Sequence, residues 1–161
     1  MIQRFPLREL CVHPRTAKQM YEGTVDLDAF ARVCEQCTLP LTYNGDIRTL
    51  EDYQRISARF PTVKRWMLGR GIVANPFLAE SIRAGKDTRD MARFQQWHAD
   101  ILSRYAENAP GDHALLGHLK ELWSYLAPTF KQGDQLWSSL KITRTREEFE
   151  RVLRLIPLQW R

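Results

Sequence analysis

Short apolar runs alternate with amphipathic helical patterns through residues 1–84, and this alternation constrains the fold more than any other feature of the sequence. Thr49 suits the N-cap of one of these helices, and Asn75-Pro76 suits the start of another. Strand–helix repeats at this spacing are typical of βαβ units, so the sequence predicts a parallel sheet. We expect strands at 10–13, 39–43 and 63–68, and helices at 26–37, 50–60 and about 75–84.

The second half of the chain has a different pattern, in which no strand-like run follows Lys86. Apolar residues recur at helical spacing, which predicts amphipathic helices. These helices span about 91–105, 115–126, 132–141 and 145–155, with Thr145 opening a capping-box pattern. We therefore expect two domains, an α/β domain over 1–85 and an all-helical bundle domain over 86–161.

Composition and charge exclude few functions. The 161 residues are 43% hydrophobic and 27% charged, with a net charge of +5. No apolar run reaches the ~20 residues that span a bilayer, and the N-terminal residues lack a signal-peptide core. We expect a cytoplasmic protein without a membrane partner. The mild basic excess permits nucleic-acid binding, but a surplus of this size is more often an ordinary solvated surface than a nucleic-acid footprint.

The three cysteines form no recognisable metal site. Cys34 and Cys37 make a single CxxC inside a helical pattern, and Cys11 is isolated. Zinc sites need further cysteine or histidine ligands at matching spacing, so we expect no metal. The two readings that remain are helix-face thiols in a reducing compartment and a redox pair.

Glycine-containing turns follow the second and third predicted strands, at Asn44-Gly45-Asp46 and Gly69-Arg70-Gly71. In parallel α/β proteins ligands bind at the carboxyl ends of the strands. Glycine lets backbone N–H groups approach an anion closely, and a following helix N-terminus adds partial positive charge. The two turns could therefore share one phosphate, with Arg70 as a charged donor. The alternative is that the glycines only permit the turns.

Three motifs occur in a fixed order: VHPRT at 12–16, YNGDI at 43–47 and MLGRGIVANPF at 67–77. Together they resemble the C-terminal half of the tRNA-dihydrouridine synthases, flavin enzymes that reduce uridine to 5,6-dihydrouridine in tRNA with NADPH. The resemblance implies a partial TIM barrel, with strands equivalent to six to eight, followed by a helical tRNA-binding domain. It covers about residues 5–84 closely and the helical tail more loosely.

The resemblance also assigns candidate roles to residues. It implies FMN as cofactor and tRNA as partner, and it places Arg15 near the substrate. His13 would lie beside the flavin or the target base; the alternative is a strand-end histidine that makes a structural hydrogen bond. The implied RNA contacts are Lys120, Lys131 and Arg144. The implied cofactor-binding residues are His13, Asn44, Gly45, Asp46, Gly69 and Arg70.

The family's first five strands, its catalytic cysteine and its flavin-binding lysine have no counterparts in this sequence. We therefore assign no catalytic residue, and expect a fragment that is inactive by itself. The alternative is a non-catalytic remnant that binds RNA weakly, or a half-barrel that associates with itself or a complementary half through open sheet edges.

Overall fold

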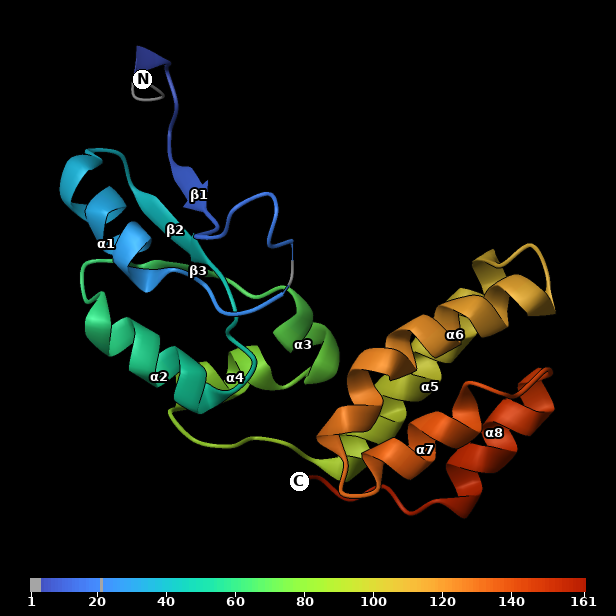
Figure 1. The fold of residues 1–161 in the computed structure, drawn as a ribbon. Coiled ribbons are helices and arrows are strands. Elements are labelled where there is room, and N and C mark those ends of the chain that lie inside the picture. The colour runs from blue at the N-terminus through green and yellow to red at the C-terminus, as the bar shows by residue number, and fades with distance from the viewer. Residues whose placement is uncertain (1–3, 21) are drawn as a thin grey trace. The chain divides into compact units, whose positions relative to one another are not determined.

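The computed structural model describes residues 4–20 and 22–161 (Figure 1). The chain forms two compact units. One comprises residues 1–72 and 78–87 and contains a sheet; the other comprises residues 73–77 and 88–161. We call them the sheet unit and the helical unit.

The sheet unit is built on three parallel strands in the order β1-β2-β3. They span β1 Leu10–Val12, β2 Leu41–Asn44 and β3 Arg65–Met67. Val12 lies opposite Tyr43, which in turn lies opposite Trp66. This register brings the carboxyl ends of the strands to one edge of the sheet. The strands and the parallel pairing expected from the sequence are confirmed.

Two helices cover one face of this sheet, α1 (Leu27–Gln36) and α2 (Leu50–Arg59) (Figure 1). Right-handed crossovers put both on the same face because the strand order follows the chain. Thr49 caps α2 through a capping box with Asp52, as its sequence predicts. The core between helices and sheet consists of Phe30, Tyr43, Ile47, Ile56, Phe60 and Val63.

The opposite face of the sheet is open in the part of the chain that the structure describes. Side chains alternate across a strand, so the neighbours of the core residues point to this face. Cys11 is exposed and Met67 is 49% exposed. Arg65 and Glu9 form an ion pair there. The sheet is therefore a one-sided layer with β1 and β3 at its edges.

The segment after β3 differs from the sequence expectation of one helix beginning near residue 75. A short helix, α3 (Arg70–Ala74), begins directly after Gly69, and α4 (Leu78–Ala84) follows after a break. Pro76 explains the break, because proline disfavours helical backbone in the residue before it. The Asn75 side chain accepts a hydrogen bond from the Phe77 backbone at 3.0 Å instead.

The helical unit contains α5 (Met91–Asn108), α6 (Asp112–Leu126), α7 (Gly133–Leu140) and α8 (Arg146–Leu155). A 3₁₀ turn, η2 (Ala127–Thr129), links α6 to the segment before α7. Thr145 caps α8, as its sequence predicts, by accepting a hydrogen bond from the Glu148 backbone. No helix among the described residues is long and apolar enough to cross a membrane.

An aromatic cluster forms the centre of the helical unit. Trp123 is fully buried and packs edge-on against Phe94 and His98. Its indole Nε1–H donates to His98 Nε2 at 3.0 Å. A nitrogen that accepts a hydrogen bond carries no proton, so His98 is neutral in this arrangement. Burial accordingly lowers the pKa of His98, partly opposed by Glu150.

This contact predicts a pH dependence of stability. Below about pH 6.5, the ordinary pKa of histidine, the unfolded chain takes up a proton that folded His98 resists. The free energy of unfolding of the helical unit should therefore fall as pH falls through that value. Urea titrations followed by tryptophan fluorescence at about pH 5 and about pH 7 measure it. His98→Leu should flatten the dependence, whereas His113→Leu, an exposed control, should not; equal dependence in both variants would contradict the assignment.

Candidate anion-binding site

The candidate site lies where β2 and β3 end side by side. Asn44 is the last residue of β2 and lies opposite Met67, the last residue of β3. Residues 45–49 then lead into α2, and Gly69 leads into α3. Because the two strands are parallel neighbours, their following turns are brought together, as the sequence predicts for a shared ligand.

A close backbone approach joins the two turns. A Cβ atom on Gly71 would lie 2.1 Å from the Ile47 carbonyl oxygen and 3.1 Å from the Arg48 Cα. Only glycine permits this contact, because both neighbours are backbone atoms that have little room to move. Gly71 therefore fixes the start of α3 against the turn after β2.

The turn after β2 is itself tightly packed. A Cβ atom on Gly45 would lie 2.8 Å from Val25 Cγ1 and 3.1 Å from the Tyr43 hydroxyl. Asp46 follows with φ of 41°, in the left-handed region that aspartate tolerates better than most residues. Burial and the nearby Asp46 raise the pKa of Tyr43 to about 12, so its hydroxyl stays neutral.

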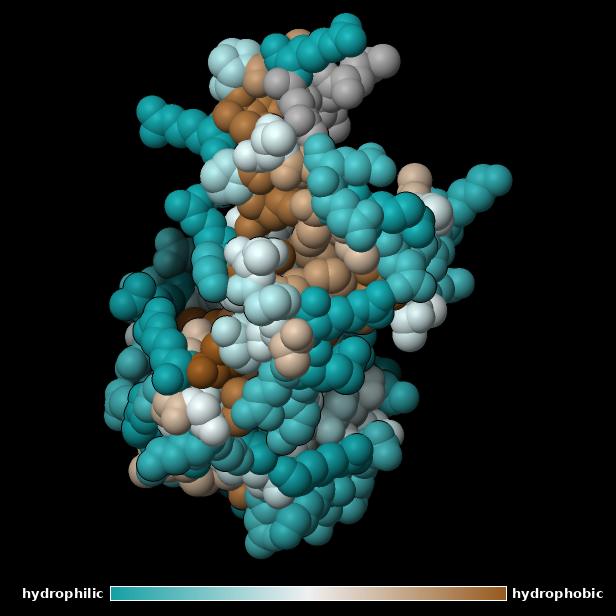
Figure 2. All heavy atoms as spheres, turned by 90° about the vertical axis from the view of Figure 1, so that its left-hand side faces the viewer, coloured by the Kyte–Doolittle hydropathy of each residue, from teal (hydrophilic) through white to brown (hydrophobic). Residues whose placement is uncertain are grey.

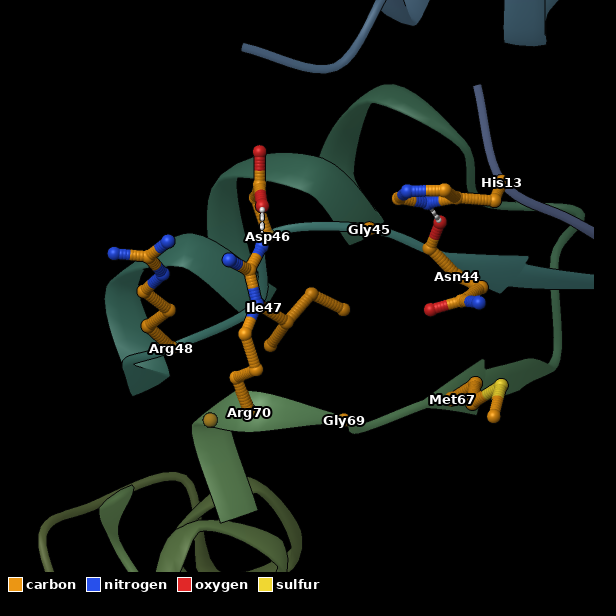
Figure 3. A pocket seen from close by; sticks show the side chains of 10 residues that line it. His13, Asn44, Gly45, Asp46, Ile47, Arg48, Met67, Gly69 and Arg70 are labelled. Atoms are coloured by element: carbon orange, nitrogen blue, oxygen red, sulfur yellow. Dashed lines mark hydrogen bonds and ion pairs between the residues drawn. The ribbon is translucent and has the colours of Figure 1, made fainter. Parts of the chain in front are cut away.

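A cavity of about 230 Å³ opens between these turns (Figure 3). Its walls come from the end of β1, the turn after β2 and the segment from Met67 to Gly71. Figure 3 shows Arg70 extending from the start of α3 toward Asp46 on one side and His13 beside Asn44 on the other. The lining residues are His13, Asn44, Gly45, Asp46, Ile47, Arg48, Met67, Gly69, Arg70 and Gly71.

His13 is oriented by a backbone contact. Its Nδ1 lies 2.7 Å from the Asn44 carbonyl oxygen. A carbonyl only accepts, so Nδ1–H donates, and a neutral ring then offers Nε2 as an acceptor. The two alternatives left by the sequence are therefore compatible, because the histidine makes a structural hydrogen bond and also lines the cavity.

Asp46 is held between two arginines. One carboxylate oxygen pairs with Arg15, and the other lies 3.1 Å from an Arg70 guanidinium nitrogen. The Arg15 side chain is only 2% exposed and also donates to the backbone carbonyls of Glu22 and Gly23. Arg15 is not among the residues that line the cavity. The structure thus places it behind Asp46, away from the wall that a ligand would touch.

All six cofactor-site candidates named from the sequence line this one cavity. Sequence reasoning left out four lining residues: Ile47, Arg48, Met67 and Gly71. Gly71 had a signal, the second glycine of the Gly-Arg-Gly turn, but its role depends on a long-range backbone contact. The described residues contain no group of histidine, cysteine, aspartate or glutamate side chains that could hold a metal, and the cysteines are free thiols.

The RNA candidates all belong to the helical unit. Lys120 is half-buried, and its ammonium donates to the Thr143 carbonyl at 2.6 Å. Lys131 and Arg144 are exposed. The structure therefore separates one lysine with a clear packing role from two solvated basic residues.

Comparison with known proteins gives consistent matches. The model of the dihydrouridine synthase (Dus) family matches residues 2–155. The tRNA-dihydrouridine(16) synthase of Cupriavidus necator is 32% identical over 154 residues, which cover 92% of this chain and 47% of that protein. The same-named protein of Shewanella oneidensis is 28% identical over 145 residues, 90% of this chain and 45% of that protein.

A third relative, the probable tRNA-dihydrouridine synthase of Rhizobium leguminosarum, is 34% identical over 128 residues, 76% of this chain and 40% of that protein. The chain thus spans about half the length of the curated relatives that it matches.

Proposed function

This chain belongs to the dihydrouridine synthase family, and from that membership we propose that it forms the phosphate end of an FMN site. The reaction that we propose for this site is the reduction of uridine to 5,6-dihydrouridine in tRNA, with NADPH as reductant. The observation that carries the proposal is the meeting of two glycine turns around a single cavity that Arg48 and Arg70 also line. A backbone-lined cavity beside an arginine suits a phosphate group better than an apolar ligand.

The residues present fit the phosphate end of FMN. Gly69 lines the cavity, and a Cβ atom added to it would meet nothing within 4 Å. In our proposal, backbone N–H groups of Gly45, Asp46 and Gly69 bind the phosphate, and the Arg70 guanidinium adds a charged contact. The cavity, at about 230 Å³, is smaller than the roughly 300–1,000 Å³ of typical cofactor pockets, which suits part of the cofactor.

When bound, a flavin supplies hydride transfer to the substrate ring. The chain's own contribution is binding and orientation. His13 lies at the other side of the cavity from Arg70, so its Nε2 is the candidate group toward the flavin or the base. We assign no proton donor, because Cys11, Cys34 and Cys37 do not line the cavity.

We also propose that residues 1–85 are part of a (β/α)₈ barrel and that residues 86–161 are a tRNA-binding domain. The open sheet face fits a barrel interior, and the edges at β1 and β3 fit pairing with further strands. Phe5 and Leu7, just before β1, are 63% and 40% exposed. Figure 2 shows hydrophobic surface in brown at the N-terminal end of the sheet unit, framed by hydrophilic side chains.

Catalysis should require the barrel to be completed, since the described cavity has room for the phosphate end alone. We expect fractions that light scattering identifies as monomer to form no dihydrouridine with FMN, NADPH and unmodified tRNA. Any activity should co-elute with a larger assembly, either a self-associated form or a complex with a complementary barrel half. Dihydrouridine formation by the monomer would overturn this expectation.

The proposed tRNA surface centres on Lys131 and Arg144, which are exposed on the helical unit. Phosphate contacts release counterions, so tRNA affinity should fall steeply with salt. Shape should dominate over base sequence, because A-form helices hide their base edges. Lys120 is a weaker candidate, since its ammonium already contacts Thr143.

Lys131→Glu combined with Arg144→Glu should therefore weaken tRNA binding and reduce the slope of log affinity against log salt by about one per lost contact. Filter binding at two salt concentrations measures both quantities. The matched control is Arg32→Glu with Lys64→Glu, two exposed basic residues of the sheet unit. Equal losses in the two pairs would show a general charge effect and contradict a specific RNA face.

A further inference from the structure

We infer that Arg15 is a positioning residue of the phosphate site, which offsets the charge of Asp46 so that a turn containing a carboxylate can accept an anion. The inference rests on the proposed FMN-phosphate function. Arg15, which the resemblance implies to lie near the substrate, is buried and does not line the cavity, so the role inferred for it is exerted through Asp46.

Asp46 poses an electrostatic problem for the proposed function. It lines the cavity, and its side chain is 21% exposed. A carboxylate beside a bound phosphate brings two like charges together in a poorly solvated place, which opposes binding. The backbone of this turn suits an anion, whereas the side chain on the same turn repels one.

Arg15 supplies the compensating charge from the side away from the ligand. Its guanidinium pairs with Asp46 Oδ2 while two of its donors hold the carbonyls of Glu22 and Gly23. These contacts fix the guanidinium in one place. The Asp26 backbone N–H also donates to the Pro14 carbonyl at 2.8 Å, which closes the loop that carries Arg15.

The same pair holds Asp46 in its unusual conformation. Left-handed backbone is unfavourable at a non-glycine residue and persists where surrounding contacts enforce it. With Oδ2 drawn to Arg15, Oδ1 is left directed at Arg70, 3.1 Å away. Arg15 thus acts on the site through Asp46 in two ways, by charge compensation and by orientation.

Rescue by a second substitution separates this role from mere support of the loop. Arg15→Met removes one of the two guanidinium groups that pair with the Asp46 carboxylate, the one on the side away from the ligand, and should weaken FMN binding by roughly tenfold. Adding Asp46→Asn to Arg15→Met removes the carboxylate's charge and should recover most of the lost FMN affinity. The contacts of Arg15 with Glu22 and Gly23 remain broken in this double variant. Asp46→Asn alone is the reference, and urea midpoints report the folding of each variant.

FMN affinity, measured by quenching of flavin fluorescence, decides the outcome. If the double variant binds as weakly as Arg15→Met, or if Arg15→Met binds like the wild type, the positioning role is wrong. If Arg15→Met does not fold, Arg15→Lys serves instead. It keeps the charge and should bind FMN within about threefold of the wild type, whereas a greater loss would overturn charge compensation. Absence of FMN binding by the wild type would overturn the proposed function itself and this role with it.

Discussion

Replacing Gly71 with alanine should lower the free energy of unfolding of the sheet unit by about 3 kcal/mol, the upper end of the usual cost of overpacking. The new Cβ atom would lie 2.1 Å from the Ile47 carbonyl oxygen and 3.0 Å from Leu78 Cδ2. The first neighbour is backbone, so the start of α3 must move away from the turn after β2. FMN binding should also be lost, because Gly71 and Ile47 both line the cavity and their separation would change its wall.

Gly69→Ala is the matched control for stability, because its Cβ atom would meet nothing within 4 Å. Urea titrations followed through the amide NMR signals of β2 and β3 compare the two variants. Wild-type stability in Gly71→Ala would contradict the close approach of the two turns and, with it, the geometry of the proposed site.

Replacing Arg70 with alanine should weaken FMN binding by roughly ten- to a hundredfold, the equivalent of about 1.5–3 kcal/mol for a hydrogen bond to a charged group. Arg70 lines the cavity and is the guanidinium closest to Asp46 on that wall. The loss has two sources, since the variant removes a donor to the phosphate and also removes one of the two guanidinium groups that pair with Asp46.

Arg32→Ala is the charge-matched control, because Arg32 is exposed on α1 and does not line the cavity. Equilibrium dialysis against FMN gives both affinities. Equal FMN affinity of Arg70→Ala and the wild type would refute the role of Arg70. An equal loss of FMN affinity in Arg32→Ala would show that the effect comes from the change in net charge alone.

The features predicted correctly from the sequence are local ones. Apolar runs, helical spacing and caps such as Thr49 and Thr145 depend on neighbouring residues, and the corresponding strands and helices are confirmed. The sequence does not predict helix α3, because five residues are too short to show a helical periodicity. The Asn75-Pro76 pattern instead predicts a helix that begins near residue 75.

The contacts that define the candidate site are long-range and could not be read from local patterns. Arg15 and Asp46 are 31 residues apart, and Gly71 meets a backbone carbonyl 24 residues earlier in the chain. The motifs at 43–47 and 67–77 predict that Gly45, Gly69 and Arg70 share one site. The buried position of Arg15 appears only once the loop after β1 is folded over the turn. The ligand roles of all these residues remain predictions.

The central claim is that the turns after β2 and β3 bind the phosphate of FMN, and parallel titration with FMN and riboflavin tests it most directly. Riboflavin lacks the phosphate and keeps the ring system. Amide NMR signals of Gly45, Asp46 and Gly69 report on the turns, and the titrations give both affinities. FMN should shift these signals and bind at least about tenfold more tightly than riboflavin. Equal affinities, or FMN binding that leaves these three signals unchanged, would contradict the central claim.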